Sequence, residues 1–448
     1  SIRAVFPMDL SPNLIPNGGF EEGLSGWRSL WTREPNVGQV IEDLQICHSG
    51  TRSARIDYEG TEDWSFDPDA SVAVNSGDIF ELQAWVKIQG DGQASISAVT
   101  YDQNRGVLDW HFAGRALKGP VDWCSLICRF VIPQNVAKIH PRLTGQEAAV
   151  VWLDDFSLSK KGNVMNTRLP KELMIQNAQL SVTLHTADVT LSVHDKRTGQ
   201  TWSQRPNHSV LLTEANLVGR GIDMICYDAL SAAVMEISLW LHDDLPEFEV
   251  KISAENVLRT PLLFPNPFVT EVGTYLVVPL NEGISYPVED SSIEPMRINA
   301  YVGHGGLSMA FWGVTDEQRG HMAIIETPDD AFIQIDRLGG KLCISPGWES
   351  QKGEFGYARR LRYIFFDKGG HVAICKRYRT YAQTIGLFKT LREKGYTNTN
   401  VDLLIGAVDV WYCDDDALAI VQEMRSLGID RILWNFANTE AQPPKTIS

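Results

Sequence analysis

The chain has 448 residues, and its 40 Lys and Arg against 56 Asp and Glu give a formal net charge of −16. This acidic balance excludes a general electrostatic attraction to nucleic acid or to anionic membranes, so we expect neither as a partner. With 44% hydrophobic and 21% charged residues, the composition is that of an ordinary globular protein. No apolar run approaches the ~20 residues that span a bilayer, and Ser1-Ile2-Arg3 does not begin a signal peptide.

The seven cysteines are scattered, and none belongs to a Cys-x-x-Cys pair. This spacing argues against a zinc ribbon, a redox motif or a disulfide framework, and it favours buried free thiols. The ten histidines include no His-Glu-x-x-His motif, so zinc hydrolysis has no support. Thirteen tryptophans are a high number, and Trp is favoured where a protein stacks on flat apolar faces, although most Trp side chains belong to cores.

Residues 1–161 predict an all-β domain. Alternating runs such as Phe80–Ile88, Ala94–Tyr101 and Cys124–Ile132 are separated by Gly, Asp and Asn turns. Short strands at this spacing predict a β-sandwich. After a linker expected at Lys160–Asn163, residues 164–368 are again mostly β, and about 200 residues of strands favour a large two-sheet sandwich.

The pattern changes after Gly369-Gly370. Residues 369–396 predict a linker helix, with an apolar stripe at helical spacing and Gly395 at its end. In residues 399–448, two apolar runs, Val401–Trp411 and Arg431–Phe436, flank a helix opened by Asp414–Asp416, which predicts one β-α-β unit. A lone parallel pair cannot bury both faces. We therefore infer an incomplete barrel, whose remainder is missing or lies on another chain.

Three motifs in residues 1–161 resemble carbohydrate-binding modules of the family 4/9/22 type. They are Asn13–Trp27, with the sequence NLIPNGGFEEGLSGW, then His48–Arg55, and finally Trp152–Leu158, and they occur in the order that the modules have. The resemblance implies a jelly-roll β-sandwich that binds sugars.

The rest of the chain resembles the front of endo-α-N-acetylgalactosaminidases and related α-N-acetylgalactosaminidases, over about residues 165–436. The residues that carry this resemblance are Gly305–Gly313, Ile324–Ala331, Tyr378–Ala382 and Ile405–Trp411. It implies a mostly β chain: the jelly-roll, then a mutarotase-like β-supersandwich, then the start of a (β/α)8 barrel. Other α-glycosidase families share this order.

Glycoside hydrolysis usually needs two carboxyl groups beside the scissile bond. In the families that the chain resembles, these groups come from middle strands of the barrel, which lie outside these residues, so the catalytic residues are unknown. At the ends of the two predicted barrel strands, Asp409, Trp411 and Trp434 are candidates for sugar contacts. The alternatives are that Asp409 is a polar residue whose hydrogen bonds are made inside the barrel mouth, and that Trp434 packs in the core. Asp414–Asp416 are best interpreted as a helix cap.

Near predicted loops or strand ends of the N-terminal module, the candidates for sugar binding are Trp64, Tyr101, Trp110 and Arg115, with packing or simple exposure as the alternative. The resemblance also implies a structural Ca²⁺ ion, held by Glu21 and Asp154 with backbone carbonyls of residues 49–53. The alternative is that these acids face solvent or cap turns. A calcium site predicts that chelation lowers the melting temperature.

Two functions remain open from the sequence. The chain is the non-catalytic front of a secreted, periplasmic or cell-surface glycoside hydrolase, of retaining α-glycosidase type, acting on oligosaccharides or polysaccharides. The alternative is a glycan-binding or scaffold protein without hydrolase activity, or one subunit of an enzyme whose barrel a second chain completes.

Overall fold

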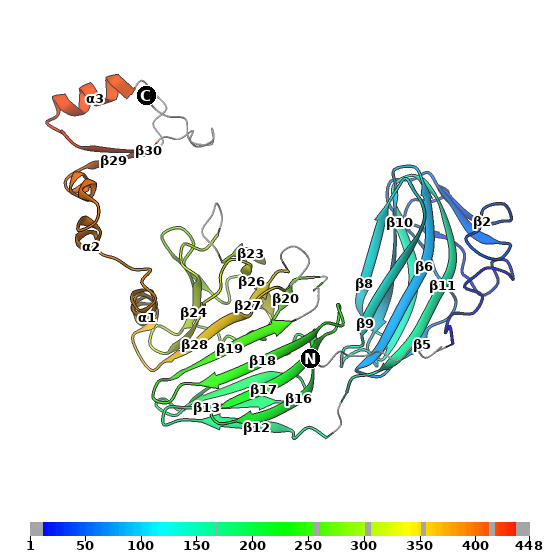
Figure 1. The fold of residues 1–448 in the computed structure, drawn as a ribbon, viewed down its shortest axis with the longest axis horizontal. Helices are drawn as coiled ribbons and strands as arrows, with labels where there is room; N and C mark the ends of the chain where they lie inside the picture. Colours follow the sequence, from blue (N-terminus) through cyan, green and yellow to red (C-terminus); the bar gives the residue numbers. More distant parts are fainter. Residues whose placement is uncertain are drawn as a thin grey trace. The chain divides into compact units, whose positions relative to one another are not determined.

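The computed structural model describes residues 12–165, 168–254, 258, 260–300, 306–350, 355–411 and 417–435. It is mostly β and divides into two compact units, Ser1–Ile374 and Cys375–Ser448 (Figure 1). Among the described residues, no helix has both the length and the apolarity that crossing a bilayer requires.

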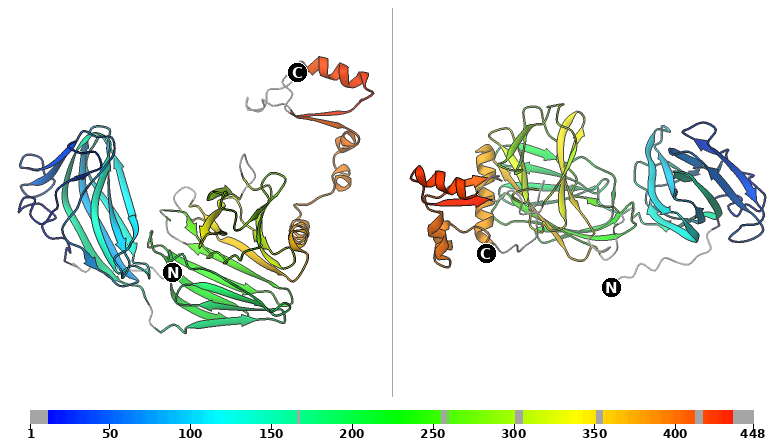
Figure 2. Two further views of the ribbon diagram at one scale, coloured as in Figure 1. Left: turned by 180° about the vertical axis from the view of Figure 1, so that it is seen from behind. Right: turned by 90° about the horizontal axis from the view of Figure 1, so that it is seen from above.

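The first part of the larger unit is a sandwich of two antiparallel sheets (Figure 2). One sheet has the order β1 (Trp31–Thr32), β4 (Asp63–Phe66), β10 (Lys138–Gln146), β7 (Gln93–Tyr101) and β8 (Val107–Lys118), with β5 (Val72–Ala73) also paired to β10. The other sheet has the order β2 (Gly38–Asp43), β3 (Ser53–Tyr58), β11 (Ala149–Asn163), β6 (Asp78–Gln89) and β9 (Val121–Val131).

The core of this first sandwich follows from the alternation of side chains along each strand. In β7, Ala94, Ile96 and Ala98 face the core, so the residues between them face outward. Two buried residues of the second sandwich, Leu211 and Ala229, also belong to this core, and the Val131 amide donates to the Ala229 carbonyl at 2.9 Å.

The expected linker at Lys160–Asn163 is wrong. These residues continue β11, where Lys160 pairs with Phe80 and Asn163 with Asp78. The side chain of Lys160 also lies 2.6 Å from the Asp78 carboxylate, so ladder pairing and an ion pair both hold the strand end in place.

The second sandwich contains three antiparallel sheets in the described part of the chain. The largest has the order β16 (Val210–Val218), β17 (Gly221–Asp228), β18 (Val234–Leu241), β19 (Glu247–Ala254), β28 (Arg359–Phe366), β25 (Gly320–Ile325), β24 (Phe311–Thr315), β21 (Tyr275–Val278) and β22 (Ile284–Pro287). The other two are β12 (Glu172–Gln176), β13 (Leu180–His185), β14 (Thr190–Asp195) and β15 (Gln200–Ser203), and β20 (Leu262–Leu263), β27 (Lys341–Trp348), β26 (Ala331–Leu338) and β23 (Met296–Asn299).

One apolar core lies between these sheets, and strands from all three contribute to it. The helix α1 (Gly370–Thr384) begins directly after β28. Its Ile374 is fully buried and lies so close to Gly313 of β24 that a Cβ at that glycine would meet the Ile374 side chain at 2.6 Å. Glycine at this position therefore lets the helix approach the sheet.

The single helix expected over residues 369–396 is wrong. Gly386 adopts a φ of 75°, which is left-handed and ends the helical path after α1. A second, short helix, α2 (Leu391–Gly395), begins at Thr390, whose hydroxyl and the Glu393 carboxylate form a reciprocal capping box.

The expected β-α-β unit is confirmed, with a later start. The strand β29 (Val408–Trp411) and the strand β30 (Ile432–Asn435) pair in parallel, with α3 (Ala417–Ser426) between them. The residues before β29 form a 3-10 helix, η2 (Thr399–Leu404), and the Asn398 side chain caps its first turn. The described residues show no closed barrel, and Asp414–Asp416 lie outside them.

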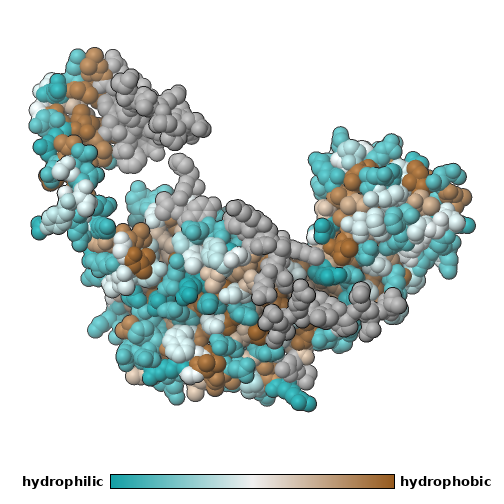
Figure 3. Space-filling view, viewed as in Figure 1, coloured by the Kyte–Doolittle hydropathy of each residue, from teal (hydrophilic) through white to brown (hydrophobic). Residues whose placement is uncertain are grey.

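The C-terminal unit leaves many large apolar side chains exposed, as its brown surface in Figure 3 shows. They lie along the whole unit and are Ile385, Leu387, Phe388, Leu391, Tyr396, Leu403, Leu404, Ile405, Val408, Leu418, Leu427 and Leu433. The two strands of this unit have no further strand beside them in the described residues.

Candidate functional site

The outward face of the β1-β4-β10-β7-β8 sheet carries several polar side chains that are buried. On β7, Ser95 and Ser97 alternate with the core residues, and on β10 His140 and Arg142 do the same. The register places Arg142 opposite Ser97 and His140 opposite Val99, so these side chains share one face. We call the residues Asp67, Ser97, His140 and Arg142 the polar floor.

Four buried polar atoms of the polar floor have no hydrogen-bond partner: Asp67 Oδ1, Ser97 Oγ, His140 Nε2 and Arg142 Nε. Ser97 is 0% and His140 4% exposed. Buried polar groups in folded proteins are nearly always paired, and an unpaired one costs about 1–3 kcal/mol. Four such atoms on one face therefore indicate a place where a polar ligand or bound water completes the hydrogen bonding.

Neighbouring contacts hold the polar floor in position. The His140 Nδ1 atom lies 3.2 Å from the Ser71 hydroxyl, and its Nε2 atom lies 3.7 Å from Asp67 Oδ2, too far for a hydrogen bond. Arg142 donates from Nη2 to the Trp110 carbonyl, which leaves its Nε free. These contacts fix the positions of the His140 and Arg142 side chains, while His140 Nε2 and Arg142 Nε make no hydrogen bond.

Two exposed tryptophans lie at opposite edges of the same sheet. Trp110 on β8 is 62% exposed, and its ring centroid lies 5.9 Å from the Arg142 guanidinium carbon. Trp31 on β1 is 50% exposed and pairs in register with Ser65, which is on the outward face of β4. Both indole rings can therefore stack on the apolar face of a ligand that lies across the polar floor.

The charges at the rim are largely balanced. Arg33 forms an ion pair with Asp63, and its hydrogen bond is the main reason that the pKa of Asp63 is lowered. The His111 ring lies against Ser95, and its Nε2 atom is 3.2 Å from the Ser95 hydroxyl. Partial burial of this ring, and secondly the charge of Arg142, lower the pKa of His111. The face therefore suits a neutral polar ligand better than a strongly charged one.

The four residues of this module that the sequence predicted to bind sugar lie in different environments. Tyr101 and Trp110 lie on the outward face, and the Lys138 ammonium sits 4.4 Å from the Tyr101 ring centroid. Trp64 faces the core and is 1% exposed, so it is not in a position to stack on a sugar. Arg115 pairs with core-facing Ile96 and donates to the Ile127 carbonyl at 3.3 Å, which ties two sheets together at their edge.

The sequence analysis missed Trp31, Ser97, His140 and Arg142. The alternation of Ala94, Ile96 and Ala98 with serines was a usable signal, because two serines on one face of a strand are unlike a core pattern. The pairing of Trp31 with β4 is a long-range register that no local pattern contains.

The predicted calcium ligands Glu21 and Asp154 both contact the loop of residues 48–52. Glu21 accepts hydrogen bonds from the Thr51 and Arg52 amides and from the Thr51 hydroxyl, and the Thr51 donors lower the pKa of Glu21. Asp154 accepts from the His48, Ser49 and Asp155 amides, while its burial raises its pKa.

These donors do not fit a calcium ion in this arrangement. Calcium takes six to eight oxygen ligands, whereas the groups that face the two carboxylates are mainly N–H donors. Among the described residues, no group of three or more His, Cys, Asp or Glu side chains is arranged to hold a metal ion. The calcium ion stays a prediction of the resemblance alone.

The barrel candidates lie in the C-terminal unit. Asp409 is exposed on β29, opposite Leu433 in register. The backbones of Trp411 and Trp434 stand at the carboxyl ends of the two parallel strands, on the same edge, but their side chains lie outside the described residues. The structure thus brings the three positions to one strand pair without showing a site between them.

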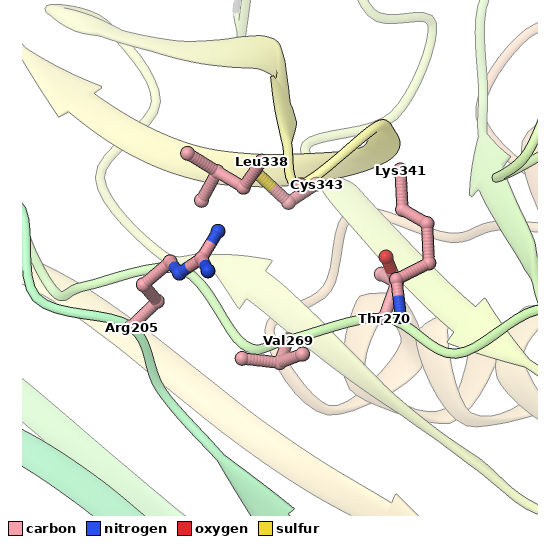
Figure 4. Close-up of a pocket in the computed structure, with 7 residues that line it drawn as sticks. Arg205, Val269, Thr270, Leu338, Lys341 and Cys343 are labelled. Atoms are coloured by element: carbon pink, nitrogen blue, oxygen red, sulfur yellow. The ribbon is translucent and has the colours of Figure 1, made fainter.

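A small cavity of about 180 Å³ lies in the second sandwich, and Figure 4 shows the Arg205 guanidinium pointing into it beside Leu338 and Cys343. The Cys343 thiol is buried, which raises its pKa to about 12, so it stays protonated. Lys341, at its edge, contacts Glu271. The cavity holds no pair of groups that could exchange a proton near neutral pH.

No protein-family model matches the chain, and no curated protein matches it. Among solved structures, the α-N-acetylgalactosaminidase NagBb of Bifidobacterium bifidum, in complex with GalNAc, is 18% identical over 59% of this chain and 51% of its own, with a TM-score of 0.49. This chain thus spans about half the length of that structure.

Two shorter solved structures are also similar. TmCBM61, in complex with β-1,4-galactotriose, is 17% identical over 34% of this chain and 99% of its own, with a TM-score of 0.26. The CBM22-1 xylan-binding domain of Paenibacillus barcinonensis Xyn10C is 16% identical over 32% and 92%, with a TM-score of 0.27. Likenesses this distant do not assign an activity to this chain.

Proposed function

We propose that the N-terminal sandwich binds neutral glycan chains on its polar floor. The observation that carries this proposal is the set of four buried polar atoms without a partner, on a face flanked by Trp31 and Trp110. Tyr101 lies on the same face and extends the aromatic surface.

The chemistry of the four atoms matches sugar hydroxyls. Asp67 Oδ1 only accepts a hydrogen bond and Arg142 Nε only donates one, whereas the Ser97 hydroxyl does both and His140 Nε2 does either, according to its tautomer. These atoms are not accessible to solvent, so a sugar reaches them through bound water, which donates and accepts as the pyranose hydroxyl groups do. The two indole faces lie at opposite edges of the sheet, so each stacks on a different sugar ring of one glycan chain.

The chain as a whole is, in this proposal, the non-catalytic front of a retaining α-glycosidase that acts on α-N-acetylgalactosaminides or α-galactosides. Support comes from the family resemblance of residues 165–436 and from the β-α-β unit that follows the two sandwiches. The nucleophile and the acid would come from barrel strands beyond these residues. The secreted, periplasmic or cell-surface location is a prediction from this class.

The exposed apolar side chains of the C-terminal unit favour this proposal over a scaffold protein without a barrel. Side chains such as Leu403, Ile405 and Leu418 would be an aggregation hazard if nothing covered them. Further polypeptide, from the same chain or from a second chain, would cover them by completing the barrel.

The binding proposal is tested by titration calorimetry of the whole chain with galactose- and GalNAc-containing oligosaccharides and with xylooligosaccharides. Trp110→Ala and Trp31→Ala should each weaken binding about tenfold, because each removes one stacking face, worth about 1.4 kcal/mol. Trp240→Ala is the matched control, since Trp240 is 51% exposed but lies on the second sandwich. Equal affinity for all three variants, or no binding to any glycan, would overturn the proposal.

The hydrolase proposal is tested on the native gene product. Its intact mass should exceed 50.0 kDa, or a second chain should accompany it, and the preparation should hydrolyse aryl α-glycosides. A native protein that ends at Ser448 and purifies alone would leave glycan binding and remove catalysis.

A further inference from the structure

Three polar side chains lie close together on the outer face of the β12-β13-β14-β15 sheet. The Glu172 carboxylate lies 3.2 Å from Nδ1 of His185, and Nε2 of the same ring lies 2.8 Å from the Ser192 hydroxyl. In the tautomer that carries its proton on Nδ1, the imidazole N–H faces the Glu172 carboxylate and Nε2 accepts a hydrogen bond from the Ser192 hydroxyl, which also lies 3.4 Å from the Ser203 hydroxyl. The register places Glu172 directly opposite His185. On the other side, His185 is opposite Thr190, and Ser192 follows two positions along β14, on the same face.

These three side chains line one open pocket of about 640 Å³. This volume suits a small molecule. The remaining lining residues come from the same sheet and from the segments beside it: Leu169, Lys171, Thr186, Ala187, Asp188, Thr190, Ser203 and Gln204.

Most of the other polar groups in the pocket are already used inside the protein. The Thr186 hydroxyl donates to the Pro170 carbonyl at 2.5 Å, and the Thr190 hydroxyl donates to Asp188 at 2.7 Å. The groups left in the lining are Ser192 with His185, the Ser203 hydroxyl, Lys171 and Gln204.

Gln204 supplies a second, independent indication of a ligand. It is 7% exposed, and its Oε1 atom accepts the Leu191 amide at 2.9 Å, which fixes the side-chain amide. Its Nε2 atom is buried and has no partner. An unpaired amide donor in the lining of such a pocket can stabilise the negative oxygen that develops in acyl transfer once the acyl oxygen reaches it.

We propose that Ser192, His185 and Glu172 form an acyl-transfer site that hydrolyses small oxygen esters, with Gln204 as the oxyanion donor. Nucleophile, base and orienting acid stand in the order that such sites require, and a donor lines the same pocket. The proposal is independent of glycan binding on the polar floor, because it uses a different sandwich and different residues.

The reaction balances with water as the only co-substrate. The Ser192 oxygen forms a bond to the acyl carbon while its proton passes to His185 Nε2. The ester C–O bond then breaks, and the departing alcohol oxygen takes that proton. Water attacks the acyl-serine, again losing a proton to His185, and releases the carboxylic acid together with the free serine. Glu172 is a positioning residue that holds the imidazole tautomer.

The test is covalent labelling of the whole chain with a fluorophosphonate, followed by peptide mass spectrometry, together with hydrolysis of p-nitrophenyl acetate. Ser192 should carry the label. Ser192→Ala should remove the label at this position, and His185→Gln should slow labelling about 100-fold, the usual worth of a general base. Glu172→Gln should slow labelling, because the imidazole then loses the carboxylate that orients it, and Glu172→Asp, which keeps a carboxylate, should restore part of the rate.

His194→Gln is the matched control. His194 lies on the same sheet face, and its Nδ1 atom is 3.0 Å from the Thr201 hydroxyl, but it does not line the pocket. This variant should label at the wild-type rate. An unlabelled Ser192 in the wild-type chain, or ester hydrolysis that Ser192→Ala leaves unchanged, would overturn the proposal. Neither result bears on glycan binding.

Discussion

Two sheet faces of this molecule contain buried polar side chains, and the two differ in whether those side chains have partners. On the polar floor of the first sandwich, four buried atoms have no partner. On the outward face of the large sheet in the second sandwich, Arg362 lies 2.8 Å from Glu326 and 3.6 Å from Glu247, and it also pairs with Glu249. The polar side chains are largely buried on both faces, but they are paired on the second face and lack partners on the first.

In our proposal, this difference separates polar groups that stabilise the fold from polar groups that bind a ligand. A paired network costs stability when it is broken, because a buried charge then remains without its counter-ion. An unpaired group already costs stability, so removing it helps the fold and harms binding. The predictions below test this distinction, from the largest expected effect to the smallest.

His321 shows what an unpaired atom does when it lies inside a core rather than on a face. Its ring is enclosed by Trp202, Phe268 and Phe365, its Nδ1 has no partner, and burial lowers its pKa to about 3 from 6.5. The unfolded chain therefore takes up a proton between pH 6.5 and 3 that the folded chain does not. The free energy of unfolding should fall through this window by up to roughly 4 kcal/mol.

Denaturant unfolding from pH 7 to pH 3 measures this loss. His321→Leu should flatten that part of the curve, whereas His194→Gln, on an exposed face, should follow the wild type. Parallel curves for wild type and His321→Leu would show that the ring is not the cause.

Breaking the paired network should be the next largest effect. Arg362→Met leaves the buried Glu326 carboxylate without this guanidinium and weakens the pairing of Glu247, and we expect a loss of about 3 kcal/mol in unfolding free energy. Arg360→Met, on the same strand but exposed, should change stability by no more than about 0.5 kcal/mol. Equal losses of stability in Arg362→Met and Arg360→Met would show that the ion pairs of Arg362 do not stabilise the fold.

Ser97→Ala should do the opposite. It removes a fully buried hydroxyl that has no partner, so the fold should gain about 1 kcal/mol while glycan binding weakens about tenfold. Ser95→Ala is the control on the same strand face, because the Ser95 hydroxyl is already paired with His111, and this variant should lose stability. Thermal unfolding and calorimetry give both readouts; a destabilised Ser97→Ala would show that internal water or an unseen partner satisfies the hydroxyl.

Chelation should have the smallest effect. Because N–H donors already surround Glu21 and Asp154, EDTA should leave the melting temperature unchanged. Glu21→Ala should lower the melting temperature equally with and without calcium, since it removes the bonds to Thr51. A fall on chelation that Glu21→Ala abolishes would instead establish the calcium ion that the family resemblance implies.

The sequence predicted the local structure well where one period dominates. Alternation gave the strands of both sandwiches, and apolar runs with a helix between them gave the parallel pair of β29 and β30. It failed where a single residue decides the path. Gly386 interrupts a stripe of helical spacing by its left-handed φ, and residues 399–404, capped by Asn398, form a 3-10 helix instead of a strand.

The candidate site was harder to predict, because it depends on which face a residue takes. Trp64 and Trp110 both looked like exposed aromatics near strand ends, but only Trp110 is exposed. The partner strands are far apart in sequence: β1 reaches the site through β4, and β10 through β7. Long-range register of this kind decides that Trp31 and Arg142 share a face with Ser97, and no local pattern encodes it.

Leu211 and Ala229, from the second sandwich, complete the core of the first. A gene fragment that encodes residues 1–161 alone would lack this plug and would expose a hole in its hydrophobic interior. Recombination that moves the binding module between genes would therefore need a receiving protein with an equivalent pair of small and branched apolar residues. The two sandwiches thus share part of one core, in contrast to modules joined by free tethers.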